Sequence, residues 1–167
     1  RVVPHGEPLP DCDAHVPMMS LPRVMRTTLE TVPREVPYLS PQADLVVEWE
    51  RRIGPRCGDL RVGIVWSGAR KLKALLNRSC PLDVLLSLQN IPGVTLYSLQ
   101  LGDAAAQLRA YPRSLRPVDL TESIVDMADT AAVISHLDLI ISIDTAVAHL
   151  TGAMGKPVWI LLPRMAD

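Results

Sequence analysis

The chain has 167 residues, 48% of them hydrophobic, and a formal net charge of −1. This length suits one domain with an additional segment, and the hydrophobic share is ample for a buried core. The near-neutral charge gives no reason to expect nucleic acid or an acidic membrane surface as a partner, although a local phosphate site is compatible with it. The cysteines Cys12, Cys57 and Cys80 have no CxxC spacing, so we expect no disulfide framework, no zinc site and a cytoplasmic location.

Neither end of the sequence carries a targeting or membrane signal. No apolar run reaches the roughly 18 residues that a membrane-spanning helix needs, and no signal peptide opens the chain. The chain starts at Arg1 without a methionine, and its last residues directly follow an apolar strand-like run. We therefore expect it to be cut from a longer protein, with its last domain truncated at the C-terminus.

Prolines are concentrated near the start, where nine of the 15 lie before residue 59. Because proline removes a backbone donor and restricts φ, long helices and central strands are disfavoured there. We predict that residues 1–58 are a proline-rich inter-domain segment containing one helix over residues 42–53. Pro41 suits the first turn of that helix, and Gly54-Pro55 suits its end.

From residue 59 to 167, short apolar strands alternate with helical segments. Such strands belong to a parallel sheet covered on both faces, and right-handed crossovers make it doubly wound. The predicted fold is therefore α/β, a Rossmann-like domain that binds ligands at the carboxyl ends of its strands. Strands are predicted at residues 62–66, 94–98, 117–120, 137–143 and 157–162, and helices at 81–88, 103–110, 123–135 and 144–154.

The most informative segment runs from residue 139 to 150, where a buried strand leads into a helix. Asp144 is predicted to occupy the N-cap, and the amides near Thr145, Ala146 and Val147 have no partner within the helix. These amides lie at the positive end of the helix dipole, which favours a diphosphate. Two plainer interpretations stay open: Asp144 as a helix cap only, and His149, one turn after Thr145, as a structural histidine.

Two other strand ends carry polar side chains. Ser67 and Gly68 follow the first strand, where a hydroxyl and a close backbone approach suit a phosphate. Arg78, at the end of the next loop, can neutralise a diphosphate, or it belongs to an ordinary solvated basic loop. Gln100 follows the second strand and is either a ligand for a ribose or base or an ordinary exposed amide.

The fourth segment, residues 126–132, has weaker signals. Met127 can pack on a purine face or in the core, and Asp129 can cap the following helix. The sequence contains no GxSxG, HExxH, Walker or GxGxxG pattern, no recognisable catalytic constellation and no metal-ligand cluster. The catalytic residues are therefore unknown.

Taken in order, these segments resemble the ADP-heptose:lipopolysaccharide heptosyltransferases, especially the bacterial branch fused behind tetratricopeptide repeats. The resemblance covers nearly all the chain and is most specific between residues 137 and 157. It implies the C-terminal half of a two-domain GT-B glycosyltransferase, preceded by an N-terminal Rossmann-like domain and in that branch by repeats. The motifs that carry it are Trp66-Ser67-Gly68, Asn77-Arg78-Ser79, Ser98-Leu99-Gln100, Asp129-Thr130-Ala131-Ala132 and residues 137–157.

By this resemblance, the chain would bind the nucleotide sugar of a metal-independent inverting transferase that needs no cofactor. The catalytic base and the acceptor site would lie in the N-terminal domain, so no activity is expected from the chain alone. Asp144, Thr145 and Ala146 would hold the diphosphate with Ser67 and Gly68 beside it, and Gln100, Met127 and Thr130 would line the nucleoside.

Two departures from the family pattern keep other functions open. The loop over residues 70–76 is basic and apolar where the branch carries a polar stretch, and the Trp-rich segment expected after the last strand is absent. A module that binds a nucleotide or nucleotide sugar without catalysis is the main alternative. A structural α/β domain that mediates assembly is the third.

Overall fold

The computed structural model describes residues 3–68 and 79–163 of the chain. The chain divides into two compact units, with the boundary between Glu35 and Val36. The first unit contains the 3-10 helix η1 (Met18–Ser20) and the short helix α1 (Leu21–Val24), which was not among the predicted elements. Pro22 lies in the first turn of α1, where the missing proline N–H breaks no helical hydrogen bond.

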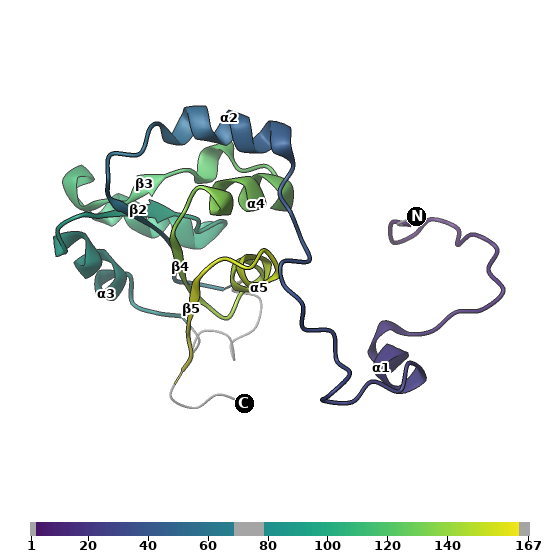
Figure 1. Cartoon of the computed structure of the whole chain (residues 1–167). Coiled ribbons are helices and arrows are strands. Elements are labelled where there is room, and N and C mark those ends of the chain that lie inside the picture. The colour runs from purple at the N-terminus through teal and green to yellow at the C-terminus, as the bar shows by residue number, and fades with distance from the viewer. Residues whose placement is uncertain (1–2, 69–78, 164–167) are drawn as a thin grey trace. The chain divides into compact units, whose positions relative to one another are not determined.

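The second unit is built on a five-stranded sheet in which every neighbouring pair is parallel (Figure 1). Its strand order is β3-β2-β1-β4-β5, so the chain winds outward from β1 in both directions. This arrangement confirms the predicted α/β, Rossmann-like fold class. The strands are β1 (Leu60–Val65), β2 (Val94–Ser98), β3 (Val118–Asp119), β4 (Leu139–Ile143) and β5 (Val158–Leu161).

The helices of this unit follow the predicted order and differ from the prediction in type or bounds at several places. The segment predicted as a helix at 103–110 is a 3-10 helix, and α4 begins at Met127 rather than at 123. Asp126, not Asp129, caps α4, because its carboxylate accepts from the amides of Ala128 and Asp129 at 2.7 and 3.0 Å. The helices are α2 (Ala43–Ile53), α3 (Leu82–Leu86), η3 (Ser87–Asn90), η4 (Asp103–Ala110), η5 (Arg113–Leu115), η6 (Thr121–Ser123), α4 (Met127–Ser135) and α5 (Ala146–Ala153).

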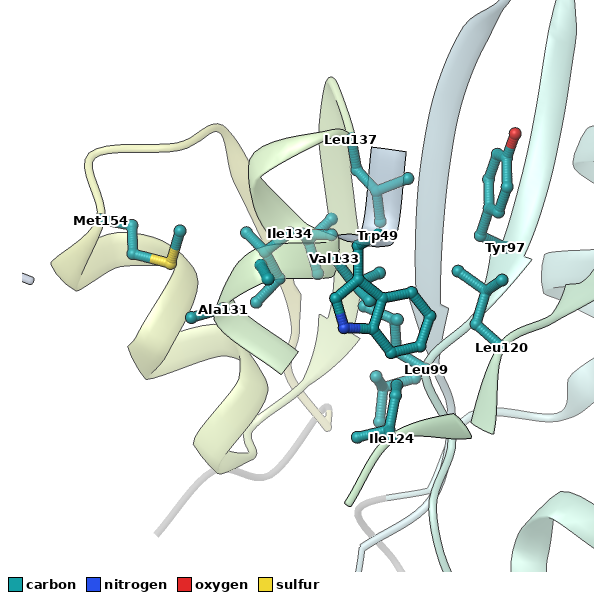
Figure 2. Packing of buried hydrophobic residues seen from close by; sticks show 13 residues of the cluster. Trp49, Tyr97, Leu99, Leu120, Ile124, Ala131, Val133, Ile134, Leu137 and Met154 are labelled. Carbon is teal, nitrogen blue, oxygen red and sulfur yellow. The ribbon is translucent and has the colours of Figure 1, made fainter. Parts of the chain in front are cut away.

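The central strands β1 and β4 are covered on both faces, and nearly all of their residues are buried. One apolar cluster joins Trp49 of α2 to the buried face of α4 and to Ile140 of β4. Figure 2 shows Trp49 among the labelled side chains of this cluster, which include Val133 and Leu99. The opposite cluster joins Leu82 and Leu85 of α3 to Ile64 of β1. Helices therefore pack against β1 and β4 from both sides.

Gly63 is the small residue that lets one face of β1 pack closely. A Cβ added there would lie 2.6 Å from Ile140 Cδ1 and 2.8 Å from Leu137 Cδ1. The missing side chain therefore provides the space that two large aliphatic residues fill. In the described ranges, no helix is both long enough and apolar enough to cross a membrane.

Candidate functional site

The order of the strands puts the topological switch point of the sheet at the carboxyl ends of β1 and β4. β2 lies on one side of β1 and β4 on the other, so the winding direction reverses between β1 and β4. In such sheets, ligands bind at this switch point. Val65 pairs with Ser142, and Ser67 and Asp144 each follow that pair by two residues. Two predicted site residues are thereby brought to the same end of neighbouring strands.

The turn from β4 into α5 differs from the prediction by one residue. Thr145, not Asp144, is the N-cap, with extended backbone angles and a carbonyl that accepts from His149 N at 3.3 Å. The helix starts one residue later than predicted because Asp144 and Thr145 both lie in the bend between β4 and α5. Asp144 and Ala146 are exposed and Thr145 is half-buried, so the turn lies at the surface.

The hydroxyl of Thr145 is directed away from the amides of its own helix. It lies 3.0 Å from Ser142 Oγ, whose proton is donated to the carbonyl of Ile143 at 2.7 Å. Thr145 makes no side-chain capping bond to α5. The first amides of α5 therefore have no side-chain cap from Thr145, at the end of the helix where partial positive charge collects.

His149 and Asp144 lie together on the exposed side of this turn. His149 Nε2 is 3.2 Å from Asp144 Oδ1, and the two side chains are 75% and 43% exposed. The predicted position of His149, one turn into the helix, thus brings its ring to the carboxylate of the turn.

Ser67 and Gly68 are half-buried just after β1. Ser67 Oγ lies 3.3 Å from Ser79 Oγ, and Ser67 lines a pocket of about 310 Å³ together with Cys80 and Gln107. Burial raises the pKa of the Cys80 thiol, which keeps it protonated and makes it a poor nucleophile. Arg78, predicted to neutralise a diphosphate, lies outside the described residues.

Gln100 is buried, which excludes the exposed-amide interpretation. Its Oε1 accepts from the amides of Trp66 and Ser67 at 3.0 and 2.8 Å. Its Nε2 donates to the carbonyls of Ser67 and Leu101, both at 3.0 Å. The side chain at the end of β2 is therefore bonded to the backbone that follows β1.

The two remaining predicted residues lie on α4 and differ in exposure. Met127, the first residue of the helix, is 47% exposed, so it is not a core methionine. Thr130 is 1% exposed, and its hydroxyl donates to the carbonyl of Asp126 at 2.9 Å. The Thr130 hydroxyl is thus used within the first turn of α4.

A polar pocket of about 450 Å³ is lined in part by Gln100, and its other side chains were not predicted from the sequence. Arg116 in its lining donates to the carbonyls of Tyr111 and Arg109, which hold its guanidinium in place. Asp119 is a polar residue at the end of a strand, as Ser67 and Gln100 are. This position was the signal in the sequence from which the pocket could have been predicted. The charged residues of the lining are Arg109, Arg116, Asp119 and Glu122.

Two further features bear on the chemistry of the site. Within residues 3–68 and 79–163, no three His, Cys, Asp or Glu side chains are grouped to hold a metal ion. A groove of about 350 Å³ between α3 and the end of β5 is lined mainly by aliphatic side chains and Trp159. Its apolar lining suits neither a phosphate nor a sugar.

Comparison with known sequences agrees with the resemblance found in the sequence. Residues 94–161 match the family described as glycosyltransferase family 9 (heptosyltransferase). The resemblance is thus confirmed over this part of the chain, from β2 to the end of β5. Protein FlbA of Caulobacter vibrioides is 26% identical over 142 residues. That match covers 82% of this chain but only 24% of FlbA.

Two solved structures share the fold. ADP-heptose LPS heptosyltransferase II of E. coli has a TM-score of 0.58 at 15% identity, over 81% of this chain and 43% of that chain. A family 9 glycosyltransferase of Veillonella parvula has a TM-score of 0.55 at 13% identity, over 73% of this chain and 36% of that chain. This chain therefore spans less than half of each.

Proposed function

We propose that residues 36–167 bind the nucleoside diphosphate sugar of a glycosyltransferase, with the diphosphate between the ends of β1 and β4. The observation that carries this proposal is the amino end of α5, which Thr145 leaves without a side-chain cap at the switch point of the sheet. A diphosphate bound there accepts hydrogen bonds from the first amides of α5 and gains from the helix dipole. The family match over residues 94–161 supports the same assignment.

The position of the diphosphate also indicates where the nucleoside of the donor would bind. Ser67 and Gly68 face the diphosphate from β1, as Asp144 and Thr145 do from β4. The nucleoside occupies the polar pocket of about 450 Å³ beside Gln100, whose size suits a small ligand. Met127 is exposed at the start of α4 but is not among the residues that line this pocket, so its expected contact with the base stays a prediction.

The reaction we propose is metal-independent transfer with inversion at the anomeric carbon. An acceptor hydroxyl loses its proton to a base on a separate N-terminal domain and forms a bond to the anomeric carbon. The bond from that carbon to the diphosphate oxygen breaks, and its electron pair leaves with the nucleoside diphosphate. The amino end of α5 stabilises the negative charge on this leaving group.

Calorimetry on the full-length protein that contains this chain tests the proposal. ADP, UDP and other nucleoside diphosphates are expected to bind more tightly than the corresponding nucleosides. Asp144→Ala should weaken diphosphate binding about tenfold, because His149 loses the carboxylate that orients its ring beside the site. Asp44→Ala, which removes an exposed carboxylate from α2, is the matched control and should leave affinity unchanged.

Two results would redirect the proposal. If no nucleoside diphosphate binds, the site is not a donor site. If a diphosphate sugar binds but is transferred to no acceptor hydroxyl, the domain is a non-catalytic nucleotide-sugar module.

A further inference from the structure

The backbone ladder between β1 and β2 ends just before the proposed donor site. The last paired residues are Ile64 and Ser98, and one further backbone bond runs from Leu99 N to Ile64 O at 3.1 Å. Beyond that bond, the Gln100 side chain joins the two segments instead of the backbone of residue 100. The conformation of Trp66 and Ser67 therefore depends on a side chain from the neighbouring strand.

A primary amide suits this task because it carries the same groups as a peptide unit. Its oxygen has two lone pairs and its nitrogen has two protons. In Gln100 the oxygen accepts from Trp66 and Ser67, and the nitrogen donates to Ser67 and Leu101. All four positions are used, and the side chain is only 4% exposed, so no group remains to bind a ribose or a base.

We infer that Gln100 is a positioning residue, which sets the conformation of the Trp66–Ser67 segment and thereby the contact of Ser67 with the diphosphate, while making no hydrogen bond to the ligand itself. This inference rests on the proposed function, because it needs a diphosphate at Ser67. It replaces the direct nucleoside contact that the family resemblance implies for Gln100. The two roles differ in which part of the ligand they affect.

Gln100→Met separates the two roles, because methionine keeps most of the volume and loses all four hydrogen bonds. If Gln100 acts through the Trp66–Ser67 segment, the affinity for a nucleoside diphosphate falls about tenfold or more, while that for the nucleoside alone changes much less, because Gln100 borders its pocket without a free hydrogen-bonding group. A direct contact with ribose or base would lower both affinities by the same factor. Competition binding with ADP and adenosine, on the full-length protein, measures the two numbers side by side.

The matched control is Gln89→Met, which makes the same substitution at a glutamine away from the Trp66–Ser67 segment. Gln89 Nε2 donates to the carbonyl of Leu115 at 2.8 Å, so this variant also removes a bond between a glutamine side chain and the backbone. Hydrogen exchange of the peptide that contains Trp66 and Ser67 gives a second readout, independent of any ligand. Exchange there should become faster in Gln100→Met and stay unchanged in Gln89→Met.

Where Gln100→Met does not fold, Gln100→Glu carries the test. It keeps the oxygens that accept from the two amides and loses the donors to Ser67 and Leu101. It should therefore lower diphosphate affinity and change nucleoside affinity much less. The inference is overturned if either variant binds the diphosphate like wild type, or if nucleoside affinity falls in parallel.

The exchange measurement separates a failure of this inference from a failure of the proposed function. If wild type binds no nucleotide, the proposed function fails, and the effect on diphosphate affinity fails with it. Faster hydrogen exchange in Gln100→Met would still support the inference that Gln100 stabilises the conformation of Trp66 and Ser67. Unchanged exchange in that variant overturns the positioning role whatever the binding data show.

Discussion

Trp49 donates its indole N–H to the carboxylate of Asp129 at 2.9 Å, across 80 residues of sequence. The bond joins α2 to α4, and Arg52 lies over the Trp49 ring at 4.9 Å from its centre. His136 adds a second link, since its Nε2 lies 2.8 Å from the carbonyl of Val46 in α2. The helix predicted within the proline-rich segment, α2, is therefore packed against α4.

Replacing Trp49 should destabilise this unit in two distinguishable steps. Trp49→Phe keeps an aromatic ring and removes the hydrogen bond, and should lower the free energy of unfolding by about 1–2 kcal/mol. Trp49→Ala also leaves a cavity and should cost about 3–5 kcal/mol. Urea unfolding measures both. Glu48→Gln, which breaks only an exposed pair with Arg52, should change stability by less than about 1 kcal/mol.

The same pair should make stability depend on acid pH. The hydrogen bond from Trp49 holds the pKa of the Asp129 carboxyl below its ordinary value, and the Val125 amide adds to this against the opposing effect of burial. A depressed folded pKa means that the stabilisation is complete above the unfolded pKa of about 4 and is lost as pH falls through the folded pKa. The stability difference between wild type and Asp129→Asn should therefore be largest near neutral pH and shrink below about pH 4. A difference that is constant with pH in urea titrations would contradict this.

Two glycine-to-alanine substitutions should change stability in opposite directions. Gly63→Ala places a methyl group against Ile140 and Leu137 in the core and should cost about 1–3 kcal/mol. Gly152→Ala lies in α5 with open space around its added Cβ, and should stabilise by about 0.5–1 kcal/mol because alanine favours the helix. Thermal unfolding of the two variants compares them directly. If both variants changed the melting temperature by equal and small amounts, the core around Gly63 would accommodate a methyl group, and the prediction would be wrong.

Capping α5 should separate stability from ligand binding. Thr145→Asp supplies a side-chain cap to the α5 amides and should stabilise the chain by about 0.5–1 kcal/mol. The same carboxylate repels a diphosphate and occupies its amides, so affinity should fall at least about tenfold. Gln42→Asp is the control, because Gln42 is the N-cap of α2 and also makes no side-chain cap bond. It should give the stability gain with no loss of affinity in calorimetry.

Sequence pattern predicted the elements well where local chemistry governs them. The strand at residues 94–98 and the helix at 42–53 match β2 and α2 to within one residue. Burial on both faces gives a strand a continuous apolar run, and a helix is bounded by residues that suit its ends. The order of such elements was enough to indicate the fold class, because few topologies accommodate it.

Single-residue positions within turns were less accessible to the same reasoning. Asp144 and Thr145 both suit an N-cap, and so do Asp126 and Asp129. In each case, backbone geometry selected one of two acceptable side chains. A local pattern ranks residue types but does not fix the residue at which a helix begins.

The sequence by itself determined the alternation of strands and helices, and with it the end of the sheet at which polar side chains collect. Only the tertiary structure decided that Gln100 bonds the backbone after β1, and that Arg109, Arg116 and Asp119 surround one pocket. The physical reason is the sequence separation over which each interaction acts. Periodicity and capping act over a few neighbouring residues, whereas these contacts depend on strand order and register across more distant parts of the chain.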